Sequence, residues 1–232
     1  MVTSPVKRVL ITGSGRGLGL ALAEHYLTNG WQVIGTCRQS TPALQRLAED
    51  PNLTIDSLDI DDEENIERFG QRWRSTPIDV VINNAGVHGT IPVSLDELDP
   101  DVFMQAFRTN ALGALLVTRA LADSVAHSER RIVVNISSRL GSIEENDWGD
   151  WYAYGSSKSA LNRITVSLAQ VLSRRGITVV ALHPGWVSTD MGGPDGPLTP
   201  AQSAQSIART VDALEPGKTG GFYDYEGRSF RW

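Results

Sequence analysis

The chain has 232 residues, 41% of them hydrophobic and 21% charged, and a formal net charge of −6. Its length suits one α/β domain with a large buried core, and the acidic balance argues against nucleic acid as a partner. The single cysteine, Cys37, excludes an intrachain disulfide, which fits a reducing compartment. Neither a signal core nor a run of about 18 apolar residues is visible. We therefore expect a cytoplasmic protein with no membrane partner.

Along the chain, runs of apolar and β-branched residues alternate with helical patterns. The sequence predicts strands at 7–12, 31–37, 53–60, 78–84, 131–137, 177–183 and 221–227, and helices at 17–29, 41–49, 61–74, 100–126, 152–174 and 200–214. Nearly apolar strands that alternate with helices indicate a parallel sheet covered on both faces. No internal repeat or linker is visible in the sequence, so we expect a single domain over residues 1–232.

The looser regions 86–98, 139–151 and 186–199 each follow a predicted strand. They therefore lie at the carboxyl ends of strands, and open α/β sheets bind ligands at these ends. We expect the functional site to be built there.

Between the first strand and the first helix the chain reads "TGSGRGLG" over residues 12–19. Glycines permit a tight turn, let the backbone approach a pyrophosphate and allow a helix to pack closely on a strand. The amino end of the following helix then presents free N–H groups to an anion. A glycine-rich turn alone is a weak signal, but the strand before it and the helix after it favour a dinucleotide site over an ordinary loop.

The choice of dinucleotide depends on the end of the second strand. A carboxylate about 20 residues after the glycines would bind the 2′-hydroxyl of an adenosine ribose, but the sequence there is "GTCR", ending in Arg38. A second guanidinium, Arg16, lies inside the glycine loop. Arginine binds phosphate bidentately, so the pair favours NADP(H) over NAD(H), although both could also be ordinary surface arginines.

Asp59 follows the third strand in "SLDIDD". It is a candidate contact to the adenine amino group. Capping of the next helix is the competing role for an acid in this stretch, and it belongs more naturally to Asp61 or Asp62.

Tyr154 stands four residues before Lys158 in the predicted helix 152–174, so both lie on one face, a turn apart. A free phenol has a pKa of about 10, so too little of it is ionised at neutral pH to act as a base. A neighbouring ammonium favours the phenolate, so Lys158 is predicted to lower the pKa of Tyr154 into a useful range for acid–base catalysis.

Taken together, these motifs resemble the short-chain dehydrogenase/reductase family. TGxxxGxG stands at 12–19, "NNAG" at 83–86, Asn110 in "RTNALG", Ser138 in "NISSRLG", YxxxK at 154–158 and "HPGWVST" at 183–189. The motifs occur in family order and cover nearly the whole chain. The stretches "GTCR", "NISSRLGSI", "ALHPGWVSTDMGG" and "YDYEGRSFRW" are further similar to the C-factor and sniffer-like carbonyl reductase branch.

This resemblance implies a Rossmann-type, doubly wound α/β domain whose seven-stranded, mainly parallel sheet has the order 3-2-1-4-5-6-7. It also implies NADP-dependent reduction of a ketone, aldehyde or quinone carbonyl, reversibly, with a small-molecule carbonyl or alcohol as substrate. The helical patterns 100–126 and 152–174 resemble those through which family members form homodimers or homotetramers.

The resemblance assigns roles to individual residues. Tyr154 would donate the proton, Ser138 would hold the carbonyl oxygen, Lys158 would bind the nicotinamide ribose, and Asn110 would anchor a water in a proton relay. The implied cofactor contacts are Gly13, Ser14, Gly15, Arg16, Gly17, Leu18, Gly19, Arg38, Asp59, Ile60, Asn84, Ala85, Gly86, Tyr154, Lys158, Pro184, Gly185, Val187 and Thr189.

Other candidates have ordinary interpretations. Cys37 has no visible acid–base partner, and the four histidines lack metal-ligand spacing, so we expect no metal site. Trp148 and Trp151 precede the helix that carries Tyr154 and are candidates for an apolar substrate pocket or for plain core packing.

The substrate itself is not specified, because family pockets are shaped by variable loops, here 87–97, 139–151 and 190–200. The C-factor resemblance leaves open a nucleotide-binding signalling protein with little turnover. The complete set of Ser138, Tyr154 and Lys158 favours catalysis over that alternative.

Overall fold

The structure, a computed structural model, describes residues 6–89, 94–145, 147 and 149–232. Seven strands form one sheet in the order β3-β2-β1-β4-β5-β6-β7, and every neighbouring pair is parallel. The predicted doubly wound sheet and its strand order are confirmed. The strands are β1 (Arg8–Thr12), β2 (Gln32–Cys37), β3 (Leu53–Ser57), β4 (Val80–Asn83), β5 (Ile132–Ile136), β6 (Thr178–His183) and β7 (Phe222–Asp224).

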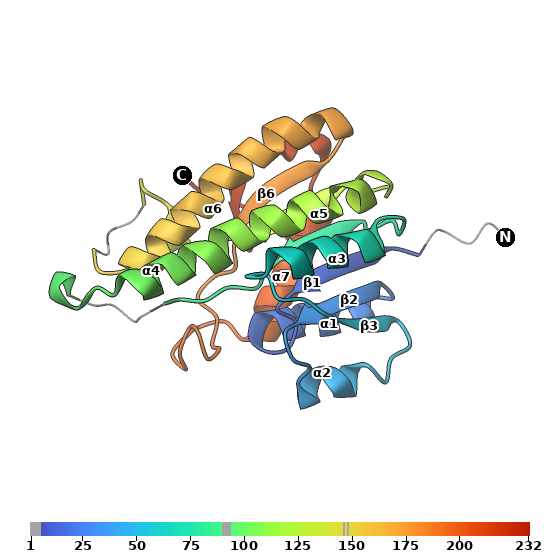
Figure 1. Cartoon of the computed structure of the whole chain (residues 1–232), viewed down its shortest axis with the longest axis horizontal. Coiled ribbons are helices and arrows are strands. Elements are labelled where there is room, and N and C mark those ends of the chain that lie inside the picture. The colour runs from blue at the N-terminus through green and yellow to red at the C-terminus, as the bar shows by residue number, and fades with distance from the viewer. Residues whose placement is uncertain (1–5, 90–93, 146, 148) are drawn as a thin grey trace.

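Helices cover both faces of the sheet, as Figure 1 shows. The α-helices are α1 (Gly17–Thr28), α2 (Pro42–Leu47), α3 (Glu63–Trp73), α4 (Pro100–Phe107), α5 (Ala114–Ala126), α6 (Tyr152–Leu172) and α7 (Pro200–Asp212). One core cluster lies between the sheet and α1, α2 and α7, and a second lies between the sheet and α3, α5 and α6. This two-sided burial explains why the strands read as almost unbroken apolar runs.

The long helix predicted at 100–126 is interrupted. A π-helical segment, η2 (Arg108–Gly113), separates α4 from α5, and Asn110 lies in this segment with 1% of its surface exposed. Apolar periodicity marks the buried face but does not reveal an insertion of this kind. Single-turn π segments are frequent at functional sites, so the irregularity falls on a residue that the sequence singled out.

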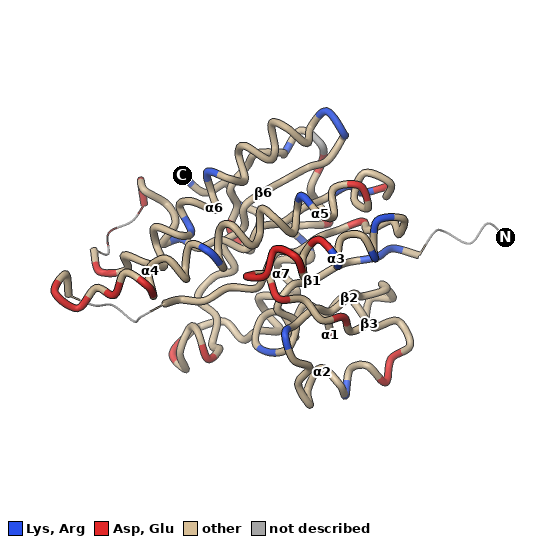
Figure 2. Tube along the Cα trace, viewed as in Figure 1, with Lys and Arg blue, Asp and Glu red and all other residues tan. Residues whose placement is uncertain are grey.

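Four of the described α-helices begin with a side-chain cap. Thr41, Asp62, Asp99 and Thr199 each cap the helix that follows, and Asp62 accepts a hydrogen bond from Asn65 N at 3.0 Å. Acidic residues, red along the trace in Figure 2, occur together at the start of α3, where their charge complements the helix dipole. Trp151 before α6 makes no capping hydrogen bond, and neither does Arg16 before α1. The first N–H groups of α1 therefore have no side-chain cap.

Buried amides brace the centre of the sheet. Asn83 on β4 donates to Asn135 on β5 at 2.8 Å and to Thr118 on α5 at 3.0 Å. Asn135 donates in turn to Thr165 on α6 at 2.8 Å. These hydrogen bonds connect the two strands to α5 and α6. Among the described residues, no helix has the length and apolarity needed to cross a membrane.

Candidate functional site

The glycine loop lies between β1 and α1, in contact with the loop that follows β4. Gly13 has a positive φ of 67°, and a Cβ there would lie 2.9 Å from the Cα of Ala85. A Cβ on Gly19 would lie 2.2 Å from the carbonyl oxygen of Gly13. Only glycine fits both positions, one for its backbone conformation and both for the close approach of neighbouring backbone. The remaining loop residues Ser14, Gly15, Arg16, Gly17 and Leu18 connect the two.

The second asparagine of "NNAG" fixes this arrangement. Asn84 Nδ2 donates to the carbonyl oxygen of Thr12 at 2.9 Å and to that of Gly13 at 3.3 Å. The hydroxyl of Thr12 accepts from the backbone N–H groups of Asn84 and Ala85, both at 3.0 Å. Thr12, predicted only as part of the glycine motif, therefore connects the glycine loop to the loop after β4 through these hydrogen bonds.

The loop after β6 reaches the same place. The side chain of Thr189 lies 3.4 Å from the position of a Cβ on Gly17. Across the surface of this junction, Arg16 forms an ion pair with Asp190 at 3.3 Å, with both side chains largely exposed. Val187 is buried, the Pro184 carbonyl accepts from Ser203 Oγ at 2.7 Å, and Gly185 has a φ of 82°. These residues shape the loop rather than sharing one contact.

At the end of β2, the acidic residue typical of NAD-binding sites is absent, because the strand ends in Thr36 and Cys37 and Arg38 follows, exposed. A Cβ on Gly15 would lie 3.6 Å from the Cβ of Cys37, so this strand end borders the glycine loop. Burial raises the pKa of the Cys37 thiol, which agrees with packing rather than nucleophilic chemistry.

The acids after β3 have distinct roles in the structure. Asp59 accepts from the backbone N–H of Asp61 at 3.0 Å, so it closes a local turn. The carboxylate of Asp61 accepts from Thr109 and Gln105, both within 3.1 Å, and thereby links this turn to α4 and η2. A Cβ on Gly113 would lie 2.9 Å from the Ile60 carbonyl oxygen, which puts Ile60 against the same helical segment.

Ser138, Tyr154 and Lys158 converge at the carboxyl end of β5. Ser138 caps the short 3₁₀ helix η3 (Arg139–Gly141), accepting from Leu140 N at 3.2 Å, and its hydroxyl also hydrogen-bonds the phenol of Tyr154. Lys158, one turn further along α6, is 4% exposed and donates to the Ile136 carbonyl at 2.8 Å. Its ammonium lies 5.6 Å from the centre of the Tyr154 ring. The sequence-predicted set is therefore assembled.

The direction of the Tyr154 shift differs from the expectation. Burial raises the pKa of Tyr154 to about 12, and the hydrogen bond with Ser138 acts in the opposite direction but is smaller. Burial also lowers the pKa of Lys158 to about 8. Spacing in sequence shows that two side chains share a helix face, but desolvation of the phenol is a tertiary effect, and it is the largest cause of the shift. At neutral pH, Tyr154 is thus a protonated donor.

Asn110 joins the pair through the backbone after β4. Its side chain accepts from Val87 N at 2.8 Å and donates to Val87 O at 2.7 Å and to Ser157 Oγ at 2.9 Å. A Cβ on Gly86 would lie 2.9 Å from Asn110 Oδ1 and 3.7 Å from Lys158 Nζ. Asn110, Gly86 and Lys158 therefore meet at one point, between the glycine loop and the Ser138–Tyr154 pair.

The buried ammonium of Lys158 gives a stability prediction. Because its pKa is about 8 in the folded protein and higher when unfolded, folding penalises the charged form below pH 8. The unfolded chain then binds more protons above this pH, so the free energy of unfolding rises towards pH 10. Relative to Lys158→Met, which never carries the charge, the wild type should gain stability between pH 8 and 10 in urea titrations. A constant difference between the two proteins over that range would contradict the assignment.

Two features of this region were not foreseen from the sequence. His183, at the end of β6, accepts from Arg139 N at 3.2 Å, and burial lowers its pKa to about 4, so the ring is neutral and orients the start of η3. The segment Phe230–Trp232 packs against the loop that follows η3 through Arg231 and Trp232. No local signal indicates either contact, since both join segments distant in sequence. Trp148, a candidate pocket residue, lies outside the described residues, and Trp151 lies 6.2 Å from the Tyr154 ring.

The site fits a dinucleotide on grounds internal to the structure. The start of α1 lacks a side-chain cap, Gly13 and Gly19 leave bare backbone beside it, and the end of β2 offers a cation in place of a carboxylate. The residues that would hold a dinucleotide are those of the glycine loop, Arg38, the Asn84–Gly86 turn, Lys158 and Thr189. Within the described part of the chain, no cluster of side chains suited to a metal ion is found.

Comparison with known proteins matches this geometry. Residues 7–197 match the family model for short chain dehydrogenases. The C-signal protein of Myxococcus xanthus is 42% identical over 156 residues, which are 67% of this chain and 93% of that protein. The carbonyl reductase Sniffer of D. melanogaster superposes with a TM-score of 0.92 at 32% identity, covering 98% of this chain and all of that one. The NADPH-bound carbonyl reductase from chicken fatty liver gives 0.89 at 30% identity, with 98% and 99% covered.

Proposed function

Because this chain belongs to the short-chain dehydrogenase family, we propose that it is an NADP(H)-dependent oxidoreductase that reduces the carbonyl of a ketone, aldehyde or quinone to the alcohol, reversibly. The observation that carries the proposal is the hydrogen-bonded pair of Ser138 and Tyr154 with Lys158 one turn away. This is the acid and the orienting hydroxyl that carbonyl reduction needs. The carbonyl reductases among its structural neighbours support the reaction class.

In this mechanism the residues position the carbonyl and provide the proton. The hydroxyl of Ser138 donates to the carbonyl oxygen and holds it beside the Tyr154 phenol. With its raised pKa, Tyr154 arrives protonated and transfers its proton to that oxygen as negative charge develops there. A reduced nicotinamide, when bound, supplies the hydride to the carbonyl carbon. Lys158 holds the ribose, and its positive charge stabilises the phenolate left on Tyr154. Asn110, which lies with Lys158 around Gly86, would anchor a water in the relay that returns a proton to Tyr154.

We expect the substrate to carry an apolar portion. Ile143, Trp186 and Met191 lie in the loops after β5 and β6, which border the site, and have 83%, 56% and 44% of their surface exposed. Large apolar side chains with this exposure on loops at a ligand-binding edge are typical of recognition surfaces.

The choice of NADP(H) is supported by Arg16 and Arg38 and by neighbours with bound NADPH or NADP. Arg38→Asp should weaken NADPH binding by at least about tenfold and leave NADH binding nearly unchanged, because only NADPH carries the 2′-phosphate. Fluorescence titration of both cofactors measures the ratio. Arg46→Asp, an exposed arginine on α2 with the same charge change, is the control. An unchanged NADPH/NADH ratio in Arg38→Asp would refute the assignment.

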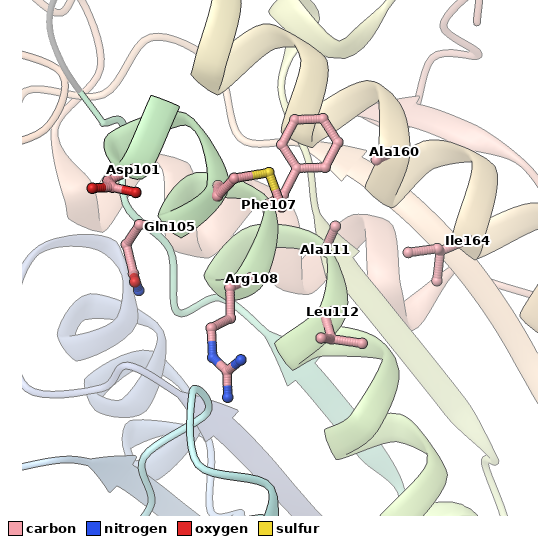
Figure 3. Close-up of a pocket in the computed structure, with 9 residues that line it drawn as sticks. Asp101, Gln105, Phe107, Arg108, Ala111, Leu112, Ala160 and Ile164 are labelled. Carbon is pink, nitrogen blue, oxygen red and sulfur yellow. The ribbon is translucent and has the colours of Figure 1, made fainter. Parts of the chain in front are cut away.

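We further propose assembly into a homodimer or homotetramer through the helical regions 100–126 and 152–174, which are α4, η2 and α5 on one side and α6 on the other. A groove of about 560 Å³ lies between α4, η2 and α6, and its apolar lining includes Phe107, Leu112 and Ile164 (Figure 3). Leu112 is 37% exposed and the neighbouring Met104 63%. Leu112→Arg should convert the oligomer to a monomer in light scattering at micromolar concentration, whereas Leu95→Arg, outside the groove, should not. A wild-type monomer under these conditions would contradict the proposal.

A signalling function is the second candidate, favoured by the identity with the C-signal protein. The two candidates differ in what they require of Tyr154, because binding of a nucleotide alone does not use a proton donor. The decisive experiment measures NADPH oxidation with a panel of ketones, aldehydes and quinones, for the wild type and for Tyr154→Phe. Cofactor binding with no turnover of any carbonyl by the wild type would favour signalling.

A further inference from the structure

The segment Phe230–Trp232 forms a set of contacts with the loop that follows η3, which we call the β5 loop (residues 142–145). The main-chain oxygen of Trp232 accepts from Ile143 N at 2.7 Å, from Glu144 N at 3.1 Å and from Ser142 Oγ at 3.0 Å. One acceptor thus serves three donors of a loop that is otherwise exposed at Ile143. These bonds join residues about 90 positions apart and are specific to the folded chain.

Side chains strengthen the same contact. Arg231 forms ion pairs with Glu144 at 2.8 Å and with Glu145 at 3.6 Å. The Trp232 ring stacks on Phe222 of β7, with centroids 5.3 Å apart and an interplanar angle of 23°. Phe230 also packs on Phe222, at 5.0 Å. The segment is therefore fixed to the sheet on one side and to the β5 loop on the other.

The β5 loop continues directly from the site. Ser138 lies four residues before Ser142, and Gly141, between them, packs tightly on Lys158, where a Cβ would lie 2.8 Å from the lysine Cβ. The Gly141 carbonyl accepts from Ser159 Oγ at 2.9 Å and from Asn162 Nδ2 at 3.0 Å. The inner end of the loop is thus held by α6, independently of the C-terminal segment. Its outer part, at Ile143 and Glu144, is held by Trp232.

We propose that Arg231 and Trp232 are positioning residues that set the conformation of the β5 loop and thereby the substrate selectivity of the site. The inference rests on the proposed function, because it assumes that the β5 loop borders the bound carbonyl compound. The physical basis of the inference is independent of the proposed function. Two backbone N–H groups and one hydroxyl of the loop lose their acceptor if Trp232 is removed. The inner end and the Ser138–Tyr154 pair keep their own partners. Selectivity should change without loss of the chemistry.

Three variants of the whole chain test this. A variant lacking Trp232 removes the main-chain oxygen that accepts from the loop. Trp232→Ala keeps this oxygen and removes the ring, and Arg231→Ala removes the ion pairs. Arg228→Ala is the matched control, because it is an arginine of the same segment with 69% exposure against 68% for Arg231, yet it pairs with Asp224 and Glu226 instead of the loop.

Hydrogen exchange of the β5 loop is the first readout, and it is independent of catalysis. Loss of Trp232 should speed amide exchange at Ile143 and Glu144 by about tenfold, because the two amides lose hydrogen bonds whose combined net free energy corresponds to about that factor. Trp232→Ala keeps the main-chain acceptor and should therefore have a smaller effect. The second readout is kinetic: KM for bulky carbonyl substrates should rise by about tenfold, with kcat and NADPH affinity little changed.

The outcomes separate the two proposals. If the wild type reduces no carbonyl but exchange quickens as expected, the proposed function fails while the contact between segment and loop stands. If the wild type is active and the variant lacking Trp232 shows unchanged exchange and unchanged KM ratios between bulky and small substrates, the inference is wrong. If the variant lacking Trp232 does not fold, the comparison of Arg231→Ala with Arg228→Ala decides. A change in the ratio of KM between bulky and small substrates in Arg231→Ala alone supports the proposal. The same ratio in both variants overturns it.

Discussion

Tyr154→Phe is expected to lower turnover of any carbonyl substrate by about 10²- to 10⁴-fold, the usual contribution of a positioned general acid. In the structure this phenol is hydrogen-bonded to Ser138, and its raised pKa keeps it protonated at neutral pH. Phenylalanine keeps the ring that packs near Trp151 and removes only the donor. NADPH oxidation measures the loss, while thermal unfolding and cofactor titration should match the wild type.

The matched control is Tyr152→Phe, the same change two residues earlier on α6 and outside the Ser138 pair. It should leave turnover nearly unaltered. Ser138→Ala should cost less than Tyr154→Phe, since the phenol can still donate to the carbonyl oxygen. Near-normal ketone reduction by Tyr154→Phe would refute the mechanism while leaving the fold untouched.

Gly19→Ala is expected to cost stability as well as cofactor binding. The added methyl would lie 2.2 Å from the Gly13 carbonyl oxygen and 2.5 Å from Asn84 Nδ2, and neither can move freely. Asn84 is held by its bonds to Thr12 and Gly13, so the glycine loop itself must shift. Overpacking of this kind costs about 1–3 kcal/mol in unfolding free energy. Because the shifted loop misplaces the N–H groups that would meet a pyrophosphate, NADPH affinity should fall by at least about tenfold.

Urea unfolding and cofactor titration of the same samples give both quantities. Gly217→Ala is the control, because a Cβ at that position has no neighbour within 4 Å. It should leave stability and NADPH affinity close to the wild type. If Gly19→Ala bound NADPH like the wild type, the proposed course of the cofactor over the glycine loop would be wrong.

The resemblance of the chain's motifs to a known family predicted the strand order, which the structure confirms, and proposed the site residues. The fold class could be predicted from the sequence pattern itself. This was possible because parallel strands buried on both faces leave continuous apolar runs, and because their carboxyl ends must meet at one edge of the sheet. The boundaries were less accurate. β3 ends at Ser57 rather than at 60, since the following residues form the turn that Asp59 closes, and the long helix is broken at η2.

The tertiary structure decided what depends on neighbours distant in sequence. Four residues of spacing put Tyr154 and Lys158 on one face of α6, but only the packed site shows that desolvation raises the phenol's pKa and lowers that of the ammonium. The Arg16–Asp190 ion pair and the hydrogen bonds between Trp232 and the β5 loop likewise join segments far apart along the chain. Periodicity and motif spacing record local geometry, and the free energy of these contacts arises only when the sheet brings its loops together.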